Sequence, residues 1–333
     1  YFGKMNSGFK LLFYFMLISA IGSAVLMNDA IAIMGVPVII LLSKRAPQLK
    51  WPLFFALAFS VTIGSNLSPI GNPQNLLIAN SGMPHPFWHF IKSLWLPSIL
   101  NLALAFGYLS FIYKKQLVQS LNLDHALDSL DNKSKADINL AKLSRISCLI
   151  LVLLILIKIL LDSFHASLHL PFSLISILAC LPILLGSKQR FSLLKQIDWG
   201  TLLFFVSLFI LISCVWQSGV LQTQVNHYGK YLLNLPTLMV VSVIGSQIIS
   251  NVPLVALYLP ILKAHSADMN MYMALAASST VAGNLSIIGA ASNVIILQKF
   301  EKLDNFTLGF GKFFIMGLPL VLVNLLVYFV FLG

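Results

Sequence analysis

The chain has 333 residues, of which 58% are hydrophobic and 9% carry a charged side chain. Soluble chains average about 25% charged residues, so these charges are too few to cover a globule with a solvated surface. The apolar content excludes a disordered chain. The formal net charge of +11 rests on too few bases to form a nucleic-acid-binding face. The composition therefore predicts an integral membrane protein.

Apolar runs divide the chain into simple and interrupted segments. A helix needs about 20 apolar residues to cross the hydrocarbon core. Five runs fit a simple span, at 94–113, 146–162, 171–186, 199–217 and 312–332. Four others contain polar interruptions, at 11–43, 51–82, 236–262 and 271–298. Backbone freed from helical hydrogen bonding is tolerated at membrane depth only where it is buried in protein or lines a cavity, so these interruptions indicate function.

The interruptions form two matched pairs. Residues 66–75 read NLSPIGNPQN and residues 284–293 read NLSIIGAASN, and they agree at six of ten positions without a gap. Each follows an Asn that begins an apolar run ending in Pro, from Asn28 to Pro37 and from Asn251 to Pro260. The sequence therefore holds an internal repeat with a period near 220 residues. Paired interrupted segments in two halves are typical of a transporter's binding site.

The positive charges predict that the two repeats are inverted. If 11–43 and 236–262 are hairpins that enter and leave on one side, and 51–82 and 271–298 cross, 17 of the 21 Lys and Arg residues share a side. The positive-inside bias places that side in the cytoplasm. The predicted fold class is an all-α polytopic membrane protein with inverted repeats, each with a re-entrant helical hairpin and a broken transmembrane helix. We expect repeats at 1–113 and 146–333, joined by a cytoplasmic linker loop at 114–145.

A helix broken at membrane depth can bind ligands at its free ends. One fragment presents N–H groups and a positive dipole end, which suit an anion, and the other presents carbonyls, which suit a cation. Amide and hydroxyl side chains serve both tasks without a permanent charge. The predicted binding residues are Asn28, Asp29, Ser65, Asn66, Ser68, Gly71, Asn72 and Asn75 in the first half, and Ser250, Asn251, Asn284, Ser286, Gly289, Ser292 and Asn293 in the second. A bound Na⁺ is expected at Asn66, Asn75, Asn284 and Asn293. The alternative is that these residues only cap their own helix ends.

Asp29 is the only carboxylate deep in an apolar run of either repeat, and Val252 occupies the related position. Ionisable residues within a membrane are costly and usually functional. Asp29 is therefore the predicted coupling residue, carrying a proton or contributing to a cation site; the alternative is a helix cap. No nucleophile–base set or phosphate-binding loop can be assembled, so we expect no enzyme, no metal centre and no cofactor beyond Na⁺ or H⁺ as coupling ion.

Four segments together resemble a known family. MNDAIAIMGVPVI, GSNLSPIGNPQN, ISNVPLVALYLP and AGNLSIIGAASNVI are similar to the ion transporter superfamily, which contains arsenite permeases, citrate transporters, divalent-anion/sodium symporters and a class of sodium/proton antiporters. The resemblance covers nearly the whole chain. The Asn-Asp-Ala tip and the run PIGNPQN look most like the arsenite-permease branch. The Ser-Asn-Thr tips typical of the symporter branch are replaced by Met27-Asn28-Asp29 and Ser250-Asn251-Val252.

The resemblance implies two re-entrant hairpins and two unwound helices that meet at a midplane site, carried by an elevator-like transport domain against a scaffold. Asn28 and Asn251 would then be the hairpin tips, and 65–75 and 283–293 the unwound segments. The family places about three scaffold helices before each hairpin. They correspond here to 146–217 in the second repeat, whereas ten residues precede the first hairpin. We therefore expect the N-terminal scaffold helices to be missing.

These observations predict a secondary active transporter of a small anion or oxyacid. An arsenite-like inorganic anion is the best substrate guess, coupled to H⁺ or Na⁺ and moved by alternating access of elevator type. The alternative is a Na⁺/H⁺ antiporter that uses Asp29. The expected partners are the anion, a coupling cation and the lipid bilayer, without nucleic acid, and a homodimer is left open. The expected location is the inner (cytoplasmic) membrane of a prokaryote, with several passes.

Overall fold

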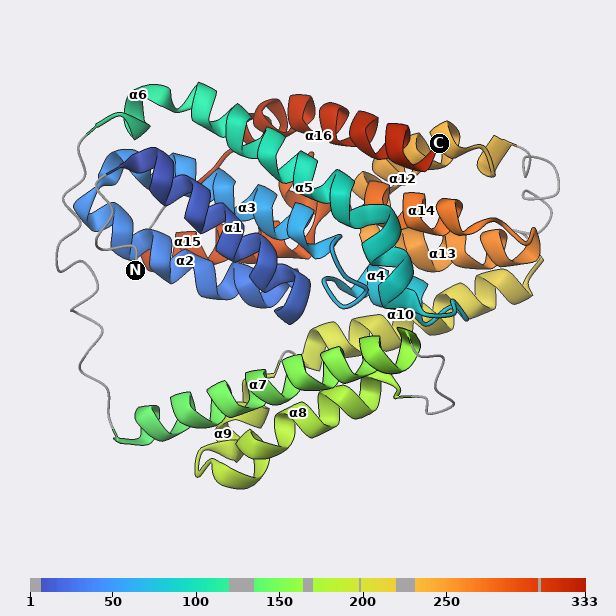
Figure 1. The fold of residues 1–333 in the computed structure, drawn as a ribbon, viewed down its shortest axis with the longest axis horizontal. Helices are drawn as coiled ribbons and strands as arrows, with labels where there is room; N and C mark the ends of the chain where they lie inside the picture. Colours follow the sequence, from blue (N-terminus) through green and yellow to red (C-terminus); the bar gives the residue numbers. More distant parts are fainter. Residues whose placement is uncertain (1–6, 120–134, 164–169, 198, 220–230, 305–306) are drawn as a thin grey trace. The chain divides into compact units, whose positions relative to one another are not determined.

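The computed structural model describes residues 7–119, 135–163, 170–197, 199–219, 231–304 and 307–333. Within these ranges the chain is helical and contains no β-strand (Figure 1). Among the described residues, four helical segments are long and apolar enough to cross a membrane: Gly8–Leu26, Pro86–Ile112, Asn139–Asp162 and Phe310–Leu332. The prediction of an all-α polytopic membrane protein is confirmed.

The chain divides into two units, each with its own internal packing. One unit comprises Tyr1–Ala126 and Leu211–Gly333, and the other comprises Leu127–Ile210. Both hairpins and both interrupted helices predicted from the sequence belong to the first unit. The second unit holds helices from the region that the resemblance implies is scaffold, and the boundary between the units falls within α10.

The first unit contains two series of helices in the same order. The earlier series is α1 (Gly8–Leu26), α2 (Asn28–Arg45), α3 (Lys50–Ser65), α4 (Pro73–Ala79) and α5 (Pro86–Ile112), with the short η2 (Pro47–Leu49) and α6 (Lys114–Leu117). The later series is α12 (Leu235–Ile249), α13 (Asn251–Ala264), α14 (Met269–Val281), α15 (Ala291–Asp304) and α16 (Phe310–Leu332), with η4 (Ala282–Asn284) and η5 (Ile287–Gly289). α5 begins at Pro86, earlier than the apolar run at 94–113, because the proline opens the helix ahead of that run.

The second unit is a smaller helical group. It contains α7 (Lys135–Ser163), α8 (Phe172–Gly186), α9 (Arg190–Lys195) and the first part of α10 (Trp199–Gln217). α7 packs against α8, and α8 against α9. The close approach of α8 to α7 is visible at Gly186, where a Cβ would lie 2.9 Å from a methyl of Leu143. α7 carries large exposed apolar side chains along its length, among them Leu149, Leu153 and Leu160, as expected of a helix in contact with lipid.

Each series begins with a helical hairpin that turns on a single residue. Met27 separates α1 from α2 with φ 69° and ψ 147°, and Ser250 separates α12 from α13 with φ 69° and ψ 163°. Such a conformation is nearly restricted to glycine and strains other residues. In both hairpins the next residue is a buried asparagine, Asn28 or Asn251, which begins the second helix. The two turns therefore share backbone geometry as well as sequence position.

The packing of the first unit repeats in the same way. α1 packs on α3 as α12 packs on α14, and α3 packs on α5 as α14 packs on α16. Each hairpin also packs against the other series, because α2 contacts α15 and α13 contacts α4. α3 and α14 form the centres of two hydrophobic clusters and are buried along nearly their whole length. This places both helix breaks, at the ends of α3 and α14, in the protein interior.

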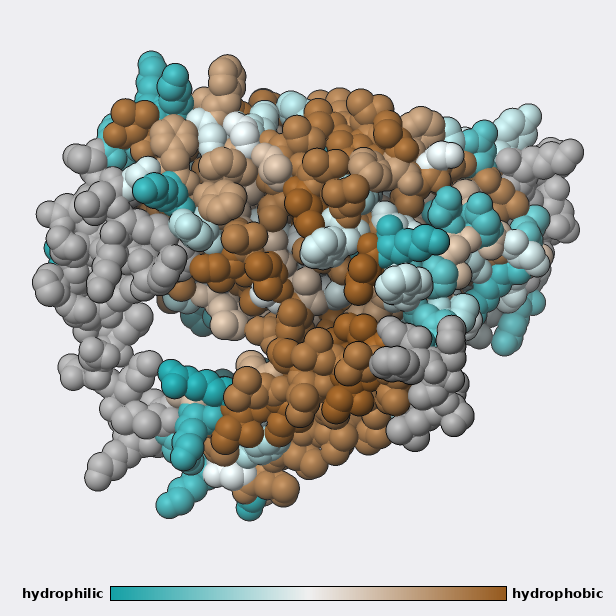
Figure 2. Space-filling model, in the orientation of Figure 1, coloured by the Kyte–Doolittle hydropathy of each residue, from teal (hydrophilic) through white to brown (hydrophobic). Residues whose placement is uncertain are grey.

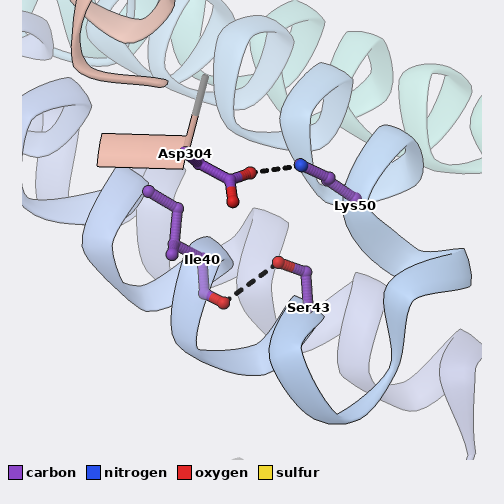
Figure 3. A network of polar contacts seen from close by, with 4 residues as sticks. All are labelled: Ile40, Ser43, Lys50 and Asp304. Atoms are coloured by element: carbon purple, nitrogen blue, oxygen red, sulfur yellow. Dashed lines mark hydrogen bonds and ion pairs between the residues drawn. The ribbon is translucent and has the colours of Figure 1, made fainter. Parts of the chain in front are cut away.

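The first unit has apolar outer faces and polar ends. Figure 2 shows a broad hydrophobic surface over α5 and α16, the two long helices of this unit. Its exposed residues include Leu100, Leu104, Leu322 and Leu326. Charged residues lie near helix ends instead. Figure 3 shows Lys50, at the start of α3, in an ion pair with Asp304 at the end of α15, beside the α2 turn in which Ser43 Oγ donates to the Ile40 carbonyl over 3.0 Å.

Candidate functional site

The first hairpin tip is hydrogen-bonded to the first helix break. The Asn28 N–H donates to the Gly71 carbonyl over 2.8 Å. The Asn28 side-chain oxygen in turn accepts from the Asp29 N–H over 2.9 Å, so it helps cap α2. The Asp29 Oδ1 atom is buried and has no hydrogen-bond partner among the described residues. The predicted coupling residue therefore lies at the tip with one open carboxylate oxygen.

The first break, between α3 and α4, is closed by its own side chains. Asn72 caps α4 by accepting from the Asn75 N–H over 2.8 Å, and its amide nitrogen donates to Ser65 Oγ over 2.9 Å. Asn75 donates its amide to the carbonyls of Ser65 and Ser68, over 3.1 and 3.3 Å. The Ser68 hydroxyl donates to the Ala24 carbonyl on α1. These hydrogen bonds thus connect the end of α3 to the start of α4 and to α1 of the first hairpin.

The second break, between α14 and α15, repeats part of this scheme. Asn293 donates its amide to the carbonyls of Gly283 and Ser286, over 2.6 and 3.4 Å, as Asn75 does to the carbonyls at the related positions. Ser286 Oγ donates to Gln247 Oε1 over 2.6 Å, and Gln247 donates to the Ala282 carbonyl over 2.8 Å. Gln247 on α12 therefore occupies the position of Ala24 and replaces its backbone carbonyl with a side chain.

Two related glycines permit the tight folding of the breaks. A Cβ on Gly71 would lie 2.1 Å from the Ser65 carbonyl oxygen, an impossible separation. A Cβ on Gly289 would lie 2.9 Å from Gln247 Oε1 and 3.0 Å from the Ala282 carbonyl oxygen. Glycine is required where backbone segments approach this closely. The first break is the tighter of the two, because the backbone lies closer to Gly71 than to Gly289.

Thr280 on α14 joins the two breaks, and Thr62 on α3 lies near the second break. Thr280 Oγ1 accepts from Asn72 over 3.2 Å and from Gln74 over 3.3 Å, so the start of α4 is held against α14. On the other side, a Cβ on Gly283 would lie 3.6 Å from the Thr62 methyl and 3.7 Å from the Asn251 amide nitrogen. The hairpin tips and the breaks therefore surround one region between α3 and α14.

Four helix N-termini begin in this region. α2 begins at Asn28, α4 at Pro73, α13 at Asn251 and α15 at Ala291. A helix N-terminus presents N–H groups and the positive end of the helix dipole, and it favours anions and polar oxygen ligands. The segments that carry these N-termini, residues 20–32, 62–80, 243–256 and 278–296, contain no Lys or Arg. Groups that could attract an anion here are therefore backbone N–H groups and neutral side chains, and not Lys or Arg.

Many polar atoms of the region are buried and open. The amide oxygens of Asn66, Asn75, Asn284 and Asn293, the four predicted sodium ligands, all lack a hydrogen-bond partner among the described residues. The same holds for Ser246 Oγ, Asn251 Oδ1, Ser292 Oγ and the Asn284 amide nitrogen. Buried polar groups are usually hydrogen-bonded, so a cluster of open ones needs an explanation. Amide and hydroxyl oxygens without partners can coordinate a cation, and the N–H groups can hold an anion.

The structure places every predicted site residue at a hairpin tip or a break. Asn28, Asp29, Ser250 and Asn251 lie at the tips; Ser65, Asn66, Ser68, Gly71, Asn72 and Asn75 lie at the first break; Asn284, Ser286, Gly289, Ser292 and Asn293 lie at the second. Asn66 differs from the others because its amide donates to the Tyr328 hydroxyl on α16, over 3.1 Å, instead of to a residue of the breaks. Whether these residues bind a ligand stays a prediction.

Sequence reasoning missed several polar residues that the fold brings to this site. Thr280 joins the two breaks, Thr62 lies beside Gly283 of the second break, and Ser246 and Gln247 lie one turn before the second hairpin tip. The internal repeat contained the signal, because Thr62 and Thr280 occupy equivalent positions, as do Ser23 and Ser246. Within the part of the chain that the structure describes, no group of three or more His, Cys, Asp or Glu residues could hold a metal ion.

Comparison with known proteins gives a consistent family. Residues 3–272 match the citrate transporter family. A 46 kDa membrane protein of Mycobacterium leprae is 26% identical over 333 residues, covering 96% of this chain and 76% of its own length. An uncharacterized transporter of Mycobacterium tuberculosis is 26% identical over 339 residues, with 97% and 76% covered. A Dictyostelium discoideum protein named as a transporter, arsB, is 23% identical over 421 residues, with 93% and 73% covered.

Proposed function

Because the chain belongs to the citrate transporter family, we propose that it is a secondary active transporter that binds a small anion or oxyacid between the two hairpin tips and the two helix breaks. The family assigns transport and not catalysis to the chain. The observation that carries the choice of site is the convergence of four helix N-termini on open, buried amide and hydroxyl groups. Broken helices of this kind form substrate sites at the midplane of transporters.

The chemistry of the site favours a substrate of low charge. A free trianion such as citrate would need strong compensation at membrane depth, and the four segments that form the site provide no Lys or Arg. Helix N-termini supply partial charges of roughly half a unit each, which suits a monoanion or an uncharged oxyacid. An arsenite-like species, rich in hydroxyls, can also use the open serine and asparagine atoms. Citrate would enter this site only with part of its charge neutralised by a cation.

Two features of the site support coupling to a cation. The open amide oxygens of Asn75, Asn284 and Asn293 offer neutral ligands of the kind that coordinate Na⁺ in broken-helix transporters. Asp29 offers a carboxylate with one open oxygen at the first hairpin tip, where it can carry a proton or complete a cation site. Coupling to H⁺ through Asp29 predicts transport driven by a pH gradient, whereas coupling to Na⁺ through the amides predicts transport driven by a Na⁺ gradient.

An elevator-type movement is supported by the division of the chain into two units. Both hairpins, both breaks, α5 and α16 belong to one unit, while α7, α8 and α9 belong to the other. An elevator needs one body that carries the complete substrate site and a second body against which it moves. The proposed substrate site lies wholly within the first unit, as this mechanism requires. The re-entrant hairpins and the inverted orientation of the repeats belong to the same proposal.

Reconstitution of the full chain into liposomes tests the function. Uptake of radiolabelled arsenite and of citrate with and without Mg²⁺ would be measured under an imposed pH gradient and, separately, a Na⁺ gradient. We expect saturable uptake of an oxyacid or of the neutralised citrate complex, driven by one of the two gradients. Exchange of Na⁺ for H⁺ that is indifferent to every anion would replace the proposal with the antiporter alternative.

The Asp29→Asn variant tests the coupling. It removes the charge and keeps the size and the hydrogen-bonding capacity of the side chain. We expect anion exchange to persist and gradient-driven accumulation to be lost, because the coupling proton or cation has no carboxylate. Asp268→Asn is the matched control, since this carboxylate caps α14 outside the site. If Asp29→Asn accumulates substrate as the unmodified protein does, Asp29 is not the coupling residue.

A further inference from the structure

A second group of buried polar side chains lies away from the hairpin tips, where α5 packs against α16. Ser98 and Asn101 are on α5, Asn324 and Tyr328 are on α16, and Asn66 reaches them from the end of α3. Asn66, Asn101, Asn324 and Tyr328 are 0% exposed, and Ser98 is 1% exposed. We call these five residues the α5–α16 cluster. Asn66 was predicted as a binding residue, whereas the four residues on α5 and α16 were not, because the sequence predicts two plain spans here.

The members of the cluster are connected through the Tyr328 hydroxyl and the Asn324 backbone. Tyr328 and Ser98 share a hydrogen bond between their hydroxyls, 2.6 Å apart, and Asn66 donates its amide to the Tyr328 hydroxyl over 3.1 Å. One turn along each helix, Asn101 donates its amide to the Asn324 carbonyl over 3.3 Å. These bonds use the side-chain amide nitrogens of Asn66 and Asn101 and leave both amide oxygens unused.

The unused atoms of the cluster are mainly oxygens. Asn66 Oδ1, Asn101 Oδ1 and Asn324 Oδ1 are buried without a hydrogen-bond partner among the described residues, as is the Asn324 amide nitrogen. When Tyr328 donates in the shared bond, the hydroxyl oxygens of Ser98 and Tyr328 each keep one acceptor site. Leaving buried amides unpaired is unfavourable, and more so in a low-dielectric interior. The cluster therefore has the composition of a ligand site and not of a core.

The location of the cluster also separates it from ordinary helix packing. α5 and α16 are two of the helices long and apolar enough to cross a membrane. Asn101 is near the middle of Pro86–Ile112, and Asn324 is well inside Phe310–Leu332. Asn101 and Asn324 are also related by the internal repeat, because they are separated along the sequence by the same number of residues as Asn28 and Asn251. Both repeats therefore place an asparagine at the point where their last long helices meet, at membrane depth.

We propose that the α5–α16 cluster is a binding site for a monovalent cation, with Na⁺ as the ligand. The amide oxygens of Asn66, Asn101 and Asn324 and the hydroxyl oxygens of Ser98 and Tyr328 supply a neutral oxygen set. An anion is disfavoured because the open donors among the described residues are few, the Asn324 amide nitrogen and one hydroxyl proton of the Ser98–Tyr328 pair, against three open amide oxygens. Ca²⁺ and Mg²⁺ are disfavoured because their sites normally include carboxylates, and the cluster has none. The site is separate from the oxyacid site and does not depend on the proposed substrate.

Sodium bound here would connect three helices, in addition to the hydrogen bonds that the cluster already makes. Asn66 ends α3 at the first break, while Asn101 and Asn324 belong to the two long helices. A cation held by all three would fix the break against α5 and α16 whether or not substrate is bound. The expected consequence is a Na⁺-dependent gain in stability that persists in the absence of any anion.

Equilibrium binding of ²²Na⁺ to the purified full chain tests the proposal, with choline replacing Na⁺ at constant ionic strength. Asn101→Leu and Asn324→Leu remove amide oxygens at nearly constant volume. We expect each to lower the number of Na⁺ ions bound per chain by one. Tyr328→Phe is a milder variant, which removes one hydroxyl, and we expect it to weaken this site about tenfold, the effect of losing one good polar contact.

Two controls separate the cluster from the breaks. Asn293→Ala removes an open amide oxygen of the second break and leaves the cluster intact, so Na⁺ binding that is sensitive to Asn324→Leu must survive in it. Asn270→Ala removes an asparagine that donates to the Leu332 carbonyl of α16, outside the cluster. If Tyr328→Phe and folded Asn324→Leu bind as much Na⁺ as the unmodified chain, the cluster holds only water and the proposal is wrong. Failure of oxyacid transport would leave this result unaffected.

Discussion

The two halves of the candidate site have the same backbone arrangement but carry different side chains. In both halves an asparagine, Asn75 or Asn293, donates to the same two carbonyls across the break. Where the first half has Asn72 and Gln74, which reach Thr280, the second half has Ala290 and Ser292. Ser292 Oγ and both polar atoms of the Asn284 side chain then lack a partner among the described residues.

This difference indicates that the first break has mainly a structural role and the second break mainly a binding role. Apart from the amide oxygens of Asn66 and Asn75, the polar side chains of the first break are hydrogen-bonded, and they hold α4 against α14, so this break acts as a fixed wall. The second break has the same fold with smaller side chains, so its polar atoms remain open to a ligand. An internally satisfied polar network stabilises a fold, whereas open buried atoms reduce stability unless a ligand fills them. The comparison predicts that stability depends mainly on the first half and ligand affinity on the second.

The glycines of the breaks provide the largest expected effect. Gly71→Ala would place a methyl against the fixed Ser65 carbonyl, and we expect a loss of about 3 kcal/mol in the free energy of unfolding, at the upper end for overpacking. Gly289→Ala meets the flexible end of Gln247 and, at 3.0 Å, the Ala282 carbonyl oxygen, and we expect a smaller loss of about 1 kcal/mol. Thermal unfolding of the purified variants measures both. Equal losses would mean that the two breaks are equally tight.

Removing single polar side chains gives the next largest effect. Asn72→Ala loses the cap of α4 and the bonds to Ser65 and Thr280, and we expect a loss of about 2 kcal/mol in stability. Ser292→Ala removes an unpartnered hydroxyl, so stability should stay within about 0.5 kcal/mol while the affinity for the transported oxyacid falls. Unfolding and ligand-binding titrations on the same samples measure the two responses. A large loss of stability in Ser292→Ala, with a small one in Asn72→Ala, would contradict the structural role of the first break and the binding role of the second.

The sequence predicts this division only in part. The interrupted runs and the repeat locate both tips and both breaks, because glycine, proline and asparagine inside apolar runs are strong local signals. Whether a given asparagine is satisfied depends on residues far along the chain, as with Asn72 and Thr280. Asn101 and Asn324 show the same limit. A lone polar residue in an apolar span does not reveal whether it faces lipid or another helix until the packing is known.

The extent of the hairpins is a further point that composition alone leaves undetermined. The arms of the first hairpin, α1 and α2, have 19 and 18 residues, whereas those of the second, α12 and α13, have 15 and 14. The apolar runs at 11–43 and 236–262 indicate where each hairpin lies. The helices extend beyond these runs by up to three residues, from Gly8 to Arg45 in the first hairpin and from Leu235 to Ala264 in the second. The two hairpins are therefore related in geometry and unequal in length.

The strained turns of the hairpins allow a smaller test of the same comparison. Met27→Gly and Ser250→Gly relieve a positive-φ conformation that costs roughly 1–3 kcal/mol in other residues, against about 1 kcal/mol of added chain entropy. We expect a net gain of about 1 kcal/mol for Ser250→Gly. The gain for Met27→Gly should be smaller, because the large apolar side chain is also lost. Thermal unfolding decides, and a loss of stability in both variants would show that the turns are not strained.

The starts of α3 and α14 give the smallest expected effect and the last contrast between the halves. The repeat relates Lys50 to Asp268, yet Lys50 pairs with Asp304 on α15, whereas Asp268 caps its own helix by accepting from the Met271 N–H over 3.0 Å. We expect Asp268→Ala to cost about 1 kcal/mol, the usual value of a helix cap. Lys50→Ala should cost about 0.5 kcal/mol, because the pair is partly exposed to solvent. Unfolding at low and high salt distinguishes them: screening should shrink the Lys50 effect and largely spare the cap, whose hydrogen bond is local. A large loss of stability in Lys50→Ala that does not depend on salt would contradict this prediction. It would show that the Lys50–Asp304 pair stabilises the fold as much as the polar contacts of the first break do.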